Sequence, residues 1–168
     1  MIAEPQLESL CASLDDSVCF EALVTGDVHW FADWPCGDVP RSGSIVYSIW
    51  NRSLEFIYVG MSGRGPTVGG GQKKGPWGRI NSHASGKRSG DQFCVYVHDF
   101  LVIHSLHNRL EEVKMRTLSL DQATRSYIRE NFGFRWMAAA SGTEALRIER
   151  LIQRGKSPLG LPLLNPLP

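Results

Sequence analysis

Two apolar runs in the middle of the chain predict a β-hairpin. Residues 44–50 (SIVYSIW) are rich in β-branched and aromatic side chains, which favour extended strands. Residues 54–59 form a second run of this kind, and the polar segment 51–53 separates the two. Because so short a connection favours antiparallel neighbours, we expect a hairpin followed by a glycine-rich loop over 60–75.

Apolar patterning and capping residues predict the remaining elements. We expect helices over 77–85, 121–131 and 141–154, and strands over 93–103 and 134–138. Asp121 fits the N-cap and Gly133 the stop of the second helix, while Ser141 and Glu144 form a capping box that opens the third. The element order predicts an α+β fold in which helices flank a small, mostly antiparallel β-sheet.

The chain of 168 residues has the length of one domain with a short extension. We expect residues 1–42 to form an N-terminal extension packed on the domain, and residues 43–168 to form the domain itself. Within the extension, residues 5–14 fit a short helix and residues 18–24 a strand. Aromatic and turn-forming residues follow, and they favour a loop docked on the domain.

Composition narrows the class of protein. A hydrophobic content of 42% with 21% charged residues is typical of a packed globular core. The four cysteines contain no C-x-x-C pair, so we expect free thiols in a reducing compartment rather than a zinc ribbon or a redox motif. We find no signal-peptide pattern and no apolar run long enough to cross a bilayer, and we expect a soluble, cytoplasmic protein without membrane contact.

Charge is distributed unevenly although the net charge is only +1. No acidic residue occurs between Glu55 and Asp91, and this block carries seven basic or histidine side chains. They are Arg64, Lys73, Lys74, Arg79, His83, Lys87 and Arg88. A positive surface of this kind suits phosphate binding, but a solvated basic loop explains the charge equally well.

Two other ligand-binding motifs are disfavoured. The glycine-rich stretch 69–75 contains no Gly-Lys-Ser/Thr, and no strand leads directly into it, so it does not fit a P-loop. His104 and His107 are three residues apart, but no second pair of cysteines or histidines stands at zinc-finger spacing. The chain therefore has no sequence signature of a nucleotide-binding loop or a zinc finger.

The last predicted helix places a carboxylate beside its buried face. At 100° per residue, Ala145, Ile148 and Ile152 share one stripe, and Glu149 lies on the edge of that stripe. A carboxylate there needs a cation, a metal or a hydrogen-bond network. A salt bridge to a neighbouring arginine is the ordinary explanation, and Glu144 is already explained by its capping position.

Four more side chains have chemistry suited to a site, although each has an ordinary explanation when taken alone. Tyr47 and Tyr58 lie in the two strands of the hairpin, where tyrosine is common. Arg79 and His83 are four residues apart on one helix face, so they point to one place. The arginine suits a phosphate, and the histidine suits proton transfer near neutral pH.

These residues occur together in an order that resembles the GIY-YIG nuclease family, over residues 43–166. The matching segments are Ile45-Val46-Tyr47, Tyr58-Val59-Gly60, Arg79 with His83, the helix around Glu149, and Pro162-Leu163-Leu164-Asn165. The pattern Arg-x-x-x-His is similar to the branch of the family that includes restriction endonucleases. Ile45 replaces the first glycine, and Val46 and Val59 stand at apolar positions, so the departures spare the chemical groups. The long loop 61–76 leaves Arg64 as a competitor for the arginine role, and we prefer Arg79 because His83 accompanies it.

The resemblance implies an α+β, GIY-YIG-like nuclease domain and a divalent-metal-dependent endonuclease that hydrolyses phosphodiester bonds in DNA. Glu149 is expected to hold one Mg²⁺ or Mn²⁺ ion. Tyr47 is expected to act as the general base, with a pKa lowered by the metal or by nearby cations and with His83 assisting. Tyr58 is expected to bind the phosphate or its water, and Arg79 to neutralise developing charge. Asn165 is expected to anchor the tail against the site.

The expected partner is DNA, which Arg64, Lys73, Lys74, Lys87 and Arg88 would contact. Candidate recognition elements are residues 1–42, the loop 61–76 and the segment 98–121. The chain has few residues to spare for a separate recognition domain, so we also expect a homodimer or a partner protein. Restriction, repair and phage defence all remain open. The alternative function is a non-cleaving or partner-dependent nucleic-acid-binding module on the same fold.

Overall fold

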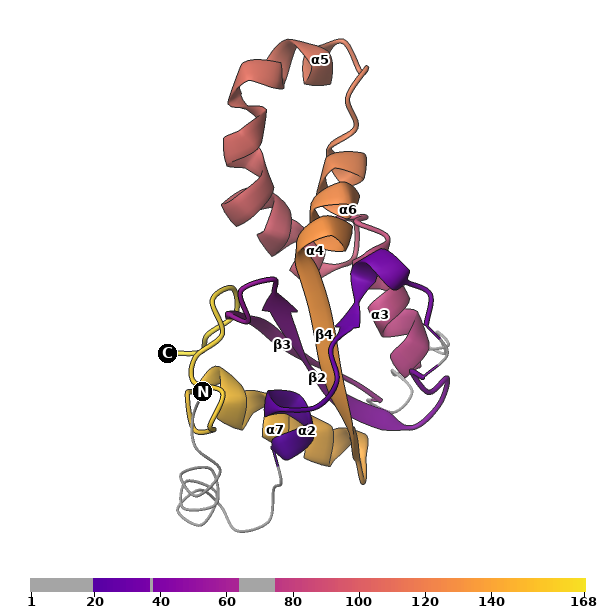
Figure 1. Ribbon diagram of the computed structural model, residues 1–168, viewed down its shortest axis with the longest axis vertical. Helices are drawn as coiled ribbons and strands as arrows, with labels where there is room; N and C mark the ends of the chain where they lie inside the picture. The colour runs from indigo at the N-terminus through magenta and orange to yellow at the C-terminus, as the bar shows by residue number, and fades with distance from the viewer. Residues whose placement is uncertain (1–19, 37, 64–74) are drawn as a thin grey trace.

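Four antiparallel strands form the centre of the computed structural model, which describes residues 20–36, 38–63 and 75–168 (Figure 1). The strands are β1 (His29–Trp30), β2 (Ser44–Asn51), β3 (Phe56–Ser62) and β4 (Phe132–Ala139), arranged in the order β1-β4-β2-β3. The predicted hairpin is confirmed, because β2 and β3 pair antiparallel. β2 lies between β3 and β4 and pairs with β4 over all eight of its residues. The predicted α+β class with a small antiparallel sheet is therefore confirmed.

Helices complete the fold on both sides of this sheet. The α-helices are α2 (Glu21–Val24), α3 (Pro76–Ala84), α4 (Gln92–Val97), α5 (Leu110–Lys114), α6 (Leu120–Asn131) and α7 (Gly142–Gln153). A 3₁₀ turn, η1 (Phe31–Asp33), follows β1. After α4 the chain continues as a π-helical turn, η2 (His98–Val102), and a 3₁₀ segment, η3 (Ile103–Arg109).

The alternation of side chains along β2 divides the core into two halves. Ile45 and Tyr47 pack in the cluster that contains the buried side chains of α3, α4 and α6, such as Phe93. Val46 points to the other face and packs in the cluster that contains Ile148 of α7. A strand buried on both faces has no exposed polar stripe, which explains why residues 45–50 are all buried. Tyr47 is thereby directed toward α3.

The prediction of a strand over 93–103 is wrong, because this segment is helical and comprises α4 and η2. Asp91 is the N-cap of α4, and its side chain accepts a hydrogen bond from the Cys94 N–H at 3.2 Å. Phe93, Cys94 and Val97 are buried, a spacing that fits one face of a helix. Periodicity alone does not separate a short apolar run in a strand from one in a buried helix.

The region before residue 43 contributes to the sheet and to the core. The expected strand over 18–24 is wrong in its described part, since residues 21–24 form α2. The strand in this region is β1, which pairs with the β4 edge through His29 and Trp30. Leu23 and Phe31 are fully buried. The helix expected over 5–14 lies outside the described residues.

Two helix boundaries differ from the predicted ones. Ser119, rather than Asp121, is the N-cap of α6. The Asp121 carboxylate instead pairs with the Arg88 guanidinium at 2.8 Å. Gly133 does not end the helix but lies within β4, where an added Cβ would stand 2.8 Å from the ring of Trp30. The glycine is needed for the close approach of β1 rather than for a turn.

The capping of α7 agrees with the prediction. The Ser141 hydroxyl accepts a hydrogen bond from the Glu144 N–H at 3.1 Å, and the Glu144 carboxylate also binds Arg147 at 3.0 Å. Ala145, Ile148 and Ile152 form the buried stripe that was expected. The helix therefore lies against the sheet with Glu149 beside its buried face, as the wheel predicts.

A helical arm projects away from the sheet in Figure 1, and it consists of η2, η3, α5 and the segment leading to α6. It corresponds to the segment 98–121, which the sequence marks as a candidate recognition element. Several of its large apolar side chains are exposed, including Phe100, Leu110 and Met115. In the described parts of the chain, no helix combines the length and the apolar character needed to cross a membrane.

Candidate active site

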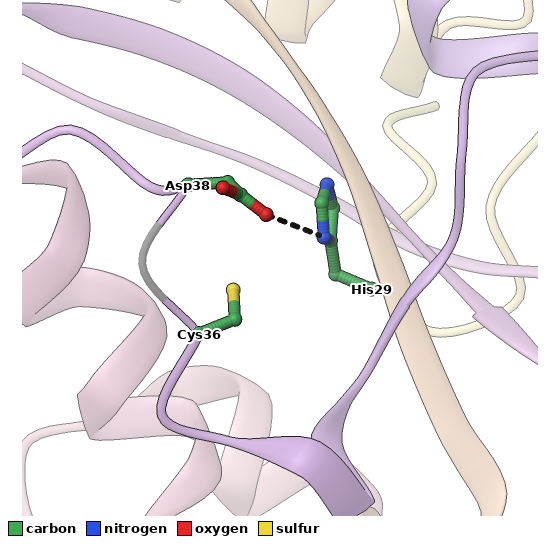
Figure 2. A group of neighbouring side chains, drawn as sticks. All are labelled: His29, Cys36 and Asp38. Carbon is green, nitrogen blue, oxygen red and sulfur yellow. Dashed lines mark ion pairs between the residues drawn. The ribbon is translucent and has the colours of Figure 1, made fainter.

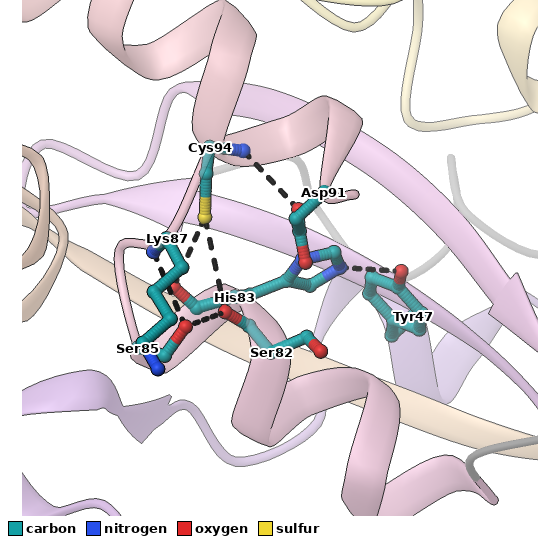
Figure 3. Close-up of polar contacts among 7 residues, drawn as sticks. All are labelled: Tyr47, Ser82, His83, Ser85, Lys87, Asp91 and Cys94. Carbon is teal, nitrogen blue, oxygen red and sulfur yellow. Dashed lines mark hydrogen bonds and ion pairs between the residues drawn. The ribbon is translucent and has the colours of Figure 1, made fainter. Parts of the chain in front are cut away.

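Tyr47 and His83 form a buried hydrogen-bonded pair between the sheet and α3. The Tyr47 hydroxyl lies 2.7 Å from His83 Nε2, and each residue is only 1% exposed (Figure 3). Tyr47 comes from the middle of β2, and His83 comes from the last turn of α3. Proline at the first position of α3 has no N–H to lose and favours a helix start there. Two of the predicted site residues are therefore in direct contact.

Gly60 allows Tyr47 to lie across the hairpin. The two residues are register partners on β3 and β2. A Cβ built on Gly60 would overlap the hydroxyl and the ring of Tyr47. The glycine of the second signature thus has a physical role, because it leaves room for the tyrosine of the first.

We expect Gly60→Ala to displace the Tyr47 ring and to lower both stability and any activity that uses this residue. Overpacking of a filled core costs about 1–3 kcal/mol. Chemical denaturation measures the loss, and the near-ultraviolet circular dichroism of the aromatic groups reports the displacement. A variant with unchanged stability and spectrum would contradict the close approach.

The second nitrogen of His83 binds an aspartate that the sequence analysis did not select. His83 Nδ1 lies 2.9 Å from both carboxylate oxygens of Asp91, which is 3% exposed. Asp91 is the acidic residue that ends the acid-free block, and it directly precedes an apolar run as a helix N-cap does. This combination predicts an N-cap at Asp91. It was not recognised because residues 93–103 were predicted to form a strand, which has no N-cap.

The charge state of Asp91 follows from its contacts. Burial raises the pKa of a carboxyl group, but the His83 ring, the Cys94 N–H and the Arg79 charge act in the opposite direction. Their combined effect holds the pKa of Asp91 below its ordinary value. Asp91 is therefore ionised at neutral pH and accepts hydrogen bonds through both oxygens.

Tyr58 also packs against the imidazole ring of His83. Its ring meets that of His83 edge-on, with centroids 6.0 Å apart and planes at 76°. It also packs on Phe93, with ring centroids 5.0 Å apart. Burial raises the pKa of Tyr58 far above its ordinary value, and the charges of Glu149 and Asp91 add to this effect. Tyr58 is therefore a neutral hydrogen-bond donor.

The protein groups around Tyr47 do not produce the lowered pKa that the resemblance implies for a general base. Burial raises the pKa of the Tyr47 hydroxyl well above its ordinary value, and Tyr58 and Glu149 raise it further. The Arg79 charge acts in the opposite direction without reversing the shift. The protein groups therefore keep Tyr47 protonated, and its hydroxyl lies in contact with His83 Nε2.

Glu149 and Arg79 are brought to the same region from opposite faces of the sheet. Glu149 is half-buried on α7, and its charge raises the pKa values of both tyrosines. Arg79 is exposed on α3, one turn before His83, and its charge lowers both values. The five predicted catalytic side chains thus fall within one electrostatic environment.

The C-terminal tail is fixed along the outer edge of β3. The Leu163 and Leu164 N–H groups donate to the carbonyls of Phe56 and Ile57 at 3.1 and 2.9 Å. The Asn165 side chain continues this pairing, since its Oδ1 accepts from the Val59 N–H at 3.1 Å and its Nδ2 donates to the Val59 carbonyl at 2.7 Å. Asn165 therefore fixes the backbone at Val59, next to Tyr58. It also supplies hydrogen-bond partners to backbone groups of β3, which is an edge strand.

We expect Asn165→Ala to loosen the tail and to destabilise the fold by about 1–3 kcal/mol, the loss of two hydrogen bonds to a part-buried backbone. Urea denaturation measures this change. Asn108→Ala, on the exposed helical arm, is the matched control and is expected to change stability by less than about 0.5 kcal/mol. Equal effects of the two substitutions would argue against the anchoring role.

The predicted DNA-contacting residues are placed only in part. Lys87 is exposed just after α3, and Arg88 is half-buried in its ion pair with Asp121. Arg64, Lys73 and Lys74 lie outside the described residues, as does most of the loop 61–76. Arg79 therefore remains the preferred candidate for the arginine role, because its charge acts on both tyrosines. The position of Arg64 gives no comparison, since it lies outside the described residues.

One group of potential metal ligands lies elsewhere in the fold. His29 Nδ1, Cys36 Sγ and an Asp38 oxygen converge near β1, all within 4.8 Å of one another (Figure 2). His29 and Asp38 are 3.8 Å apart, and the Asp38 side chain is 72% exposed. Imidazole and thiolate suit softer cations than Mg²⁺. This group is separated from β3 by two strands and does not include Glu149.

The donors at the candidate active site fit a hard divalent cation. Mg²⁺ is commonly bound by one or two carboxylates, with water and substrate phosphate completing its shell. Glu149 supplies such a carboxylate near the buried tyrosines, and the Arg79 charge acts on the same two tyrosines. A single carboxylate of this kind is therefore suited to a metal ion whose remaining ligands are water and substrate.

Comparisons with protein-family models, with curated proteins and with solved structures give no match for this chain.

Proposed function

We propose that this protein is a divalent-metal-dependent endonuclease that hydrolyses phosphodiester bonds in DNA, of the GIY-YIG type. The buried 2.7 Å contact between the Tyr47 hydroxyl and His83 Nε2 is the observation that carries the proposal. A buried phenol needs a nearby acceptor before it can take a proton from water, and His83 is such an acceptor.

In the proposed reaction, a water molecule attacks the phosphorus and gives its proton to the Tyr47 oxygen. The Tyr47 hydroxyl proton passes to His83 Nε2 in the same step, so that no free phenolate is required. This coupling fits the raised pKa of Tyr47, which disfavours a standing phenolate at neutral pH. After the P–O bond breaks, the leaving oxygen takes up a proton from solvent.

Two further residues act on the phosphate. Arg79 is exposed beside the tyrosines and presents a planar guanidinium to the negative charge that develops on the phosphate oxygens. Tyr58 donates its hydrogen bond to the phosphate or to the attacking water. Burial raises the pKa of Tyr58, so its hydroxyl stays protonated. In this scheme neither group exchanges a proton.

Glu149 is the residue proposed to hold the Mg²⁺ or Mn²⁺ ion. When bound, the ion would polarise the phosphate and stabilise the leaving oxygen. Glu149 carries no proton in this scheme, and its role is to bind the cation at the edge of the site next to Tyr58.

The test is a cleavage assay of the purified protein on supercoiled, linear, single-stranded and branched DNA, and on RNA. We expect cleavage in Mg²⁺ or Mn²⁺ and none after chelation with EDTA, with restoration by added Mg²⁺. Sequencing the product ends separates sequence-specific restriction from structure-specific cleavage. DNA binding in a gel-shift assay without cleavage of any substrate would support the non-cleaving module instead.

A further inference from the structure

We propose that Asp91 is a positioning residue that holds neutral His83 with its hydrogen on Nδ1, so that Nε2 is the acceptor for the Tyr47 proton. Asp91, His83 and Tyr47 then form one proton relay that crosses from α4 through α3 to the sheet. The catalytic consequence rests on the proposed function, but the tautomer of His83 is a property of the folded protein alone.

The contacts of the imidazole define the direction of the relay. An ionised carboxylate only accepts hydrogen bonds, so the 2.9 Å contacts of Nδ1 with both Asp91 oxygens place a hydrogen on Nδ1. In a neutral ring, Nε2 then has a free lone pair and accepts from the Tyr47 hydroxyl at 2.7 Å. The opposite tautomer would leave Nδ1 and the carboxylate with facing lone pairs.

The Asp91 carboxylate is fixed by two contacts, one with His83 Nδ1 and one with the start of α4. Its Oδ1 accepts from the Cys94 N–H at 3.2 Å as the N-cap of α4. The Cys94 thiol in turn contacts the His83 carbonyl, with Sγ and the oxygen 3.5 Å apart (Figure 3). Phe93 packs against the imidazole, with ring centroids 4.9 Å apart. These contacts join α4 to α3 and fix the carboxylate and the ring in one orientation.

Burial makes the carboxylate necessary once the proton has moved. When Nε2 takes the Tyr47 proton, His83 becomes an imidazolium at a buried position. Asp91 forms an ion pair with that charge, which would otherwise be costly in the interior. The other charged or titratable groups facing this region are Tyr58, Arg79 and Glu149. The Asp91 carboxylate contacts the imidazole directly, at 2.9 Å.

Asp91→Asn is the substitution that tests this role. Asparagine is as good an N-cap as aspartate, so α4 is expected to be retained. If its Oδ1 keeps the bond from the Cys94 N–H, its NH₂ group faces His83 Nδ1 and donates to it. The ring then carries its hydrogen on Nε2, which donates to Tyr47 instead of accepting from it. The relay is reversed although size and shape are conserved.

The first measurement is ¹⁵N NMR of the histidine ring in the full chain, with the His83 signals assigned by comparison with His83→Gln. In the wild type we expect a protonated Nδ1 and a pyridine-type Nε2, and in Asp91→Asn the reverse. A wild-type His83 with hydrogen on Nε2, or on both nitrogens at neutral pH, would overturn the proposal. This reading of the wild type holds even if the variant fails to fold.

The second measurement is the rate of Mg²⁺-dependent DNA cleavage, for which we expect a loss of about 100-fold or more in Asp91→Asn with unchanged DNA binding. Asp38→Asn is the matched control, because it alters another carboxylate beside a histidine nitrogen, at the opposite edge of the sheet. It is expected to leave the His83 signals and the cleavage rate unchanged. Wild-type cleavage by a folded Asp91→Asn protein with a reversed tautomer would refute the catalytic part.

The two proposals fail in different ways. If the protein cleaves no nucleic acid but His83 shows the expected tautomer, the nuclease function is wrong and the positioning by Asp91 stands. If the protein cleaves DNA and the tautomer is the opposite one, the relay is wrong and the nuclease function stands.

Discussion

Glu149→Gln is expected to abolish metal-dependent DNA cleavage while the protein stays folded. Glutamine keeps the size of the side chain but loses the charge that binds a hard cation. An ion that stabilises the transition state by several kcal/mol corresponds to a loss of about 1000-fold or more. Single-turnover cleavage of plasmid in Mg²⁺ measures the rate, and circular dichroism checks the fold.

Glu144→Gln provides the control on the same helix. Glu144 lies five residues earlier on α7 and binds Arg147, so this substitution also removes a half-buried carboxylate. We expect it to change stability slightly and cleavage by less than about threefold, since an ion pair of this exposure contributes at most about 1 kcal/mol. Glu149→Gln with the wild-type cleavage rate would remove Glu149 from the site.

Tyr47→Phe is expected to lower the cleavage rate by about 100- to 10,000-fold, the range associated with loss of a general base. The substitution removes one oxygen and leaves the aromatic ring that fills the core above Gly60. It also deprives His83 Nε2 of its partner at 2.7 Å. We expect DNA binding in a gel-shift assay to be unchanged, because the substitution removes no charge and the hydroxyl is buried.

Tyr127→Phe controls for the loss of a tyrosine hydroxyl elsewhere. Tyr127 is half-buried on α6 and packs on Phe132. Its substitution is expected to leave cleavage within about twofold of the wild type. Full activity of Tyr47→Phe beside a normal Tyr127→Phe protein would assign the base role to another group.

Elements with a strong local signal were predictable from the sequence. The hairpin follows from two β-branched runs with a short polar segment between them, although β3 begins at Phe56 rather than at residue 54. Helix α7 follows from Ser141 as its cap and an apolar stripe at helical spacing. The segment 93–103 was not predictable in this way, because its apolar run has no clear period. Its helical state depends on burial between α3 and α6, together with a cap supplied by Asp91.

The residues of the candidate site were likewise predictable only in part. Motif order pointed to Tyr47, Tyr58 and Glu149, and the four-residue spacing pointed to Arg79 with His83. Asp91 was not predicted, because its place in the site depends on its contact with His83 on another helix. Residue spacing along the chain does not predict such a contact. The raised pKa of Tyr47 also required the structure, since burial was the largest cause and the sequence emphasised the neighbouring cations instead.

The position of β2 between two partners has a consequence for local opening of the molecule. Backbone amides in a strand paired on both sides exchange with solvent only through large openings of the fold, whereas elements at the periphery open more readily. Tyr47 therefore lies on a strand whose backbone amides are expected to exchange slowly. Glu149 lies on α7, which packs on one face of the sheet. Detachment of α7 would move Glu149, the carboxylate proposed to bind the metal, away from the site, while the pair of Tyr47 and His83 stayed assembled.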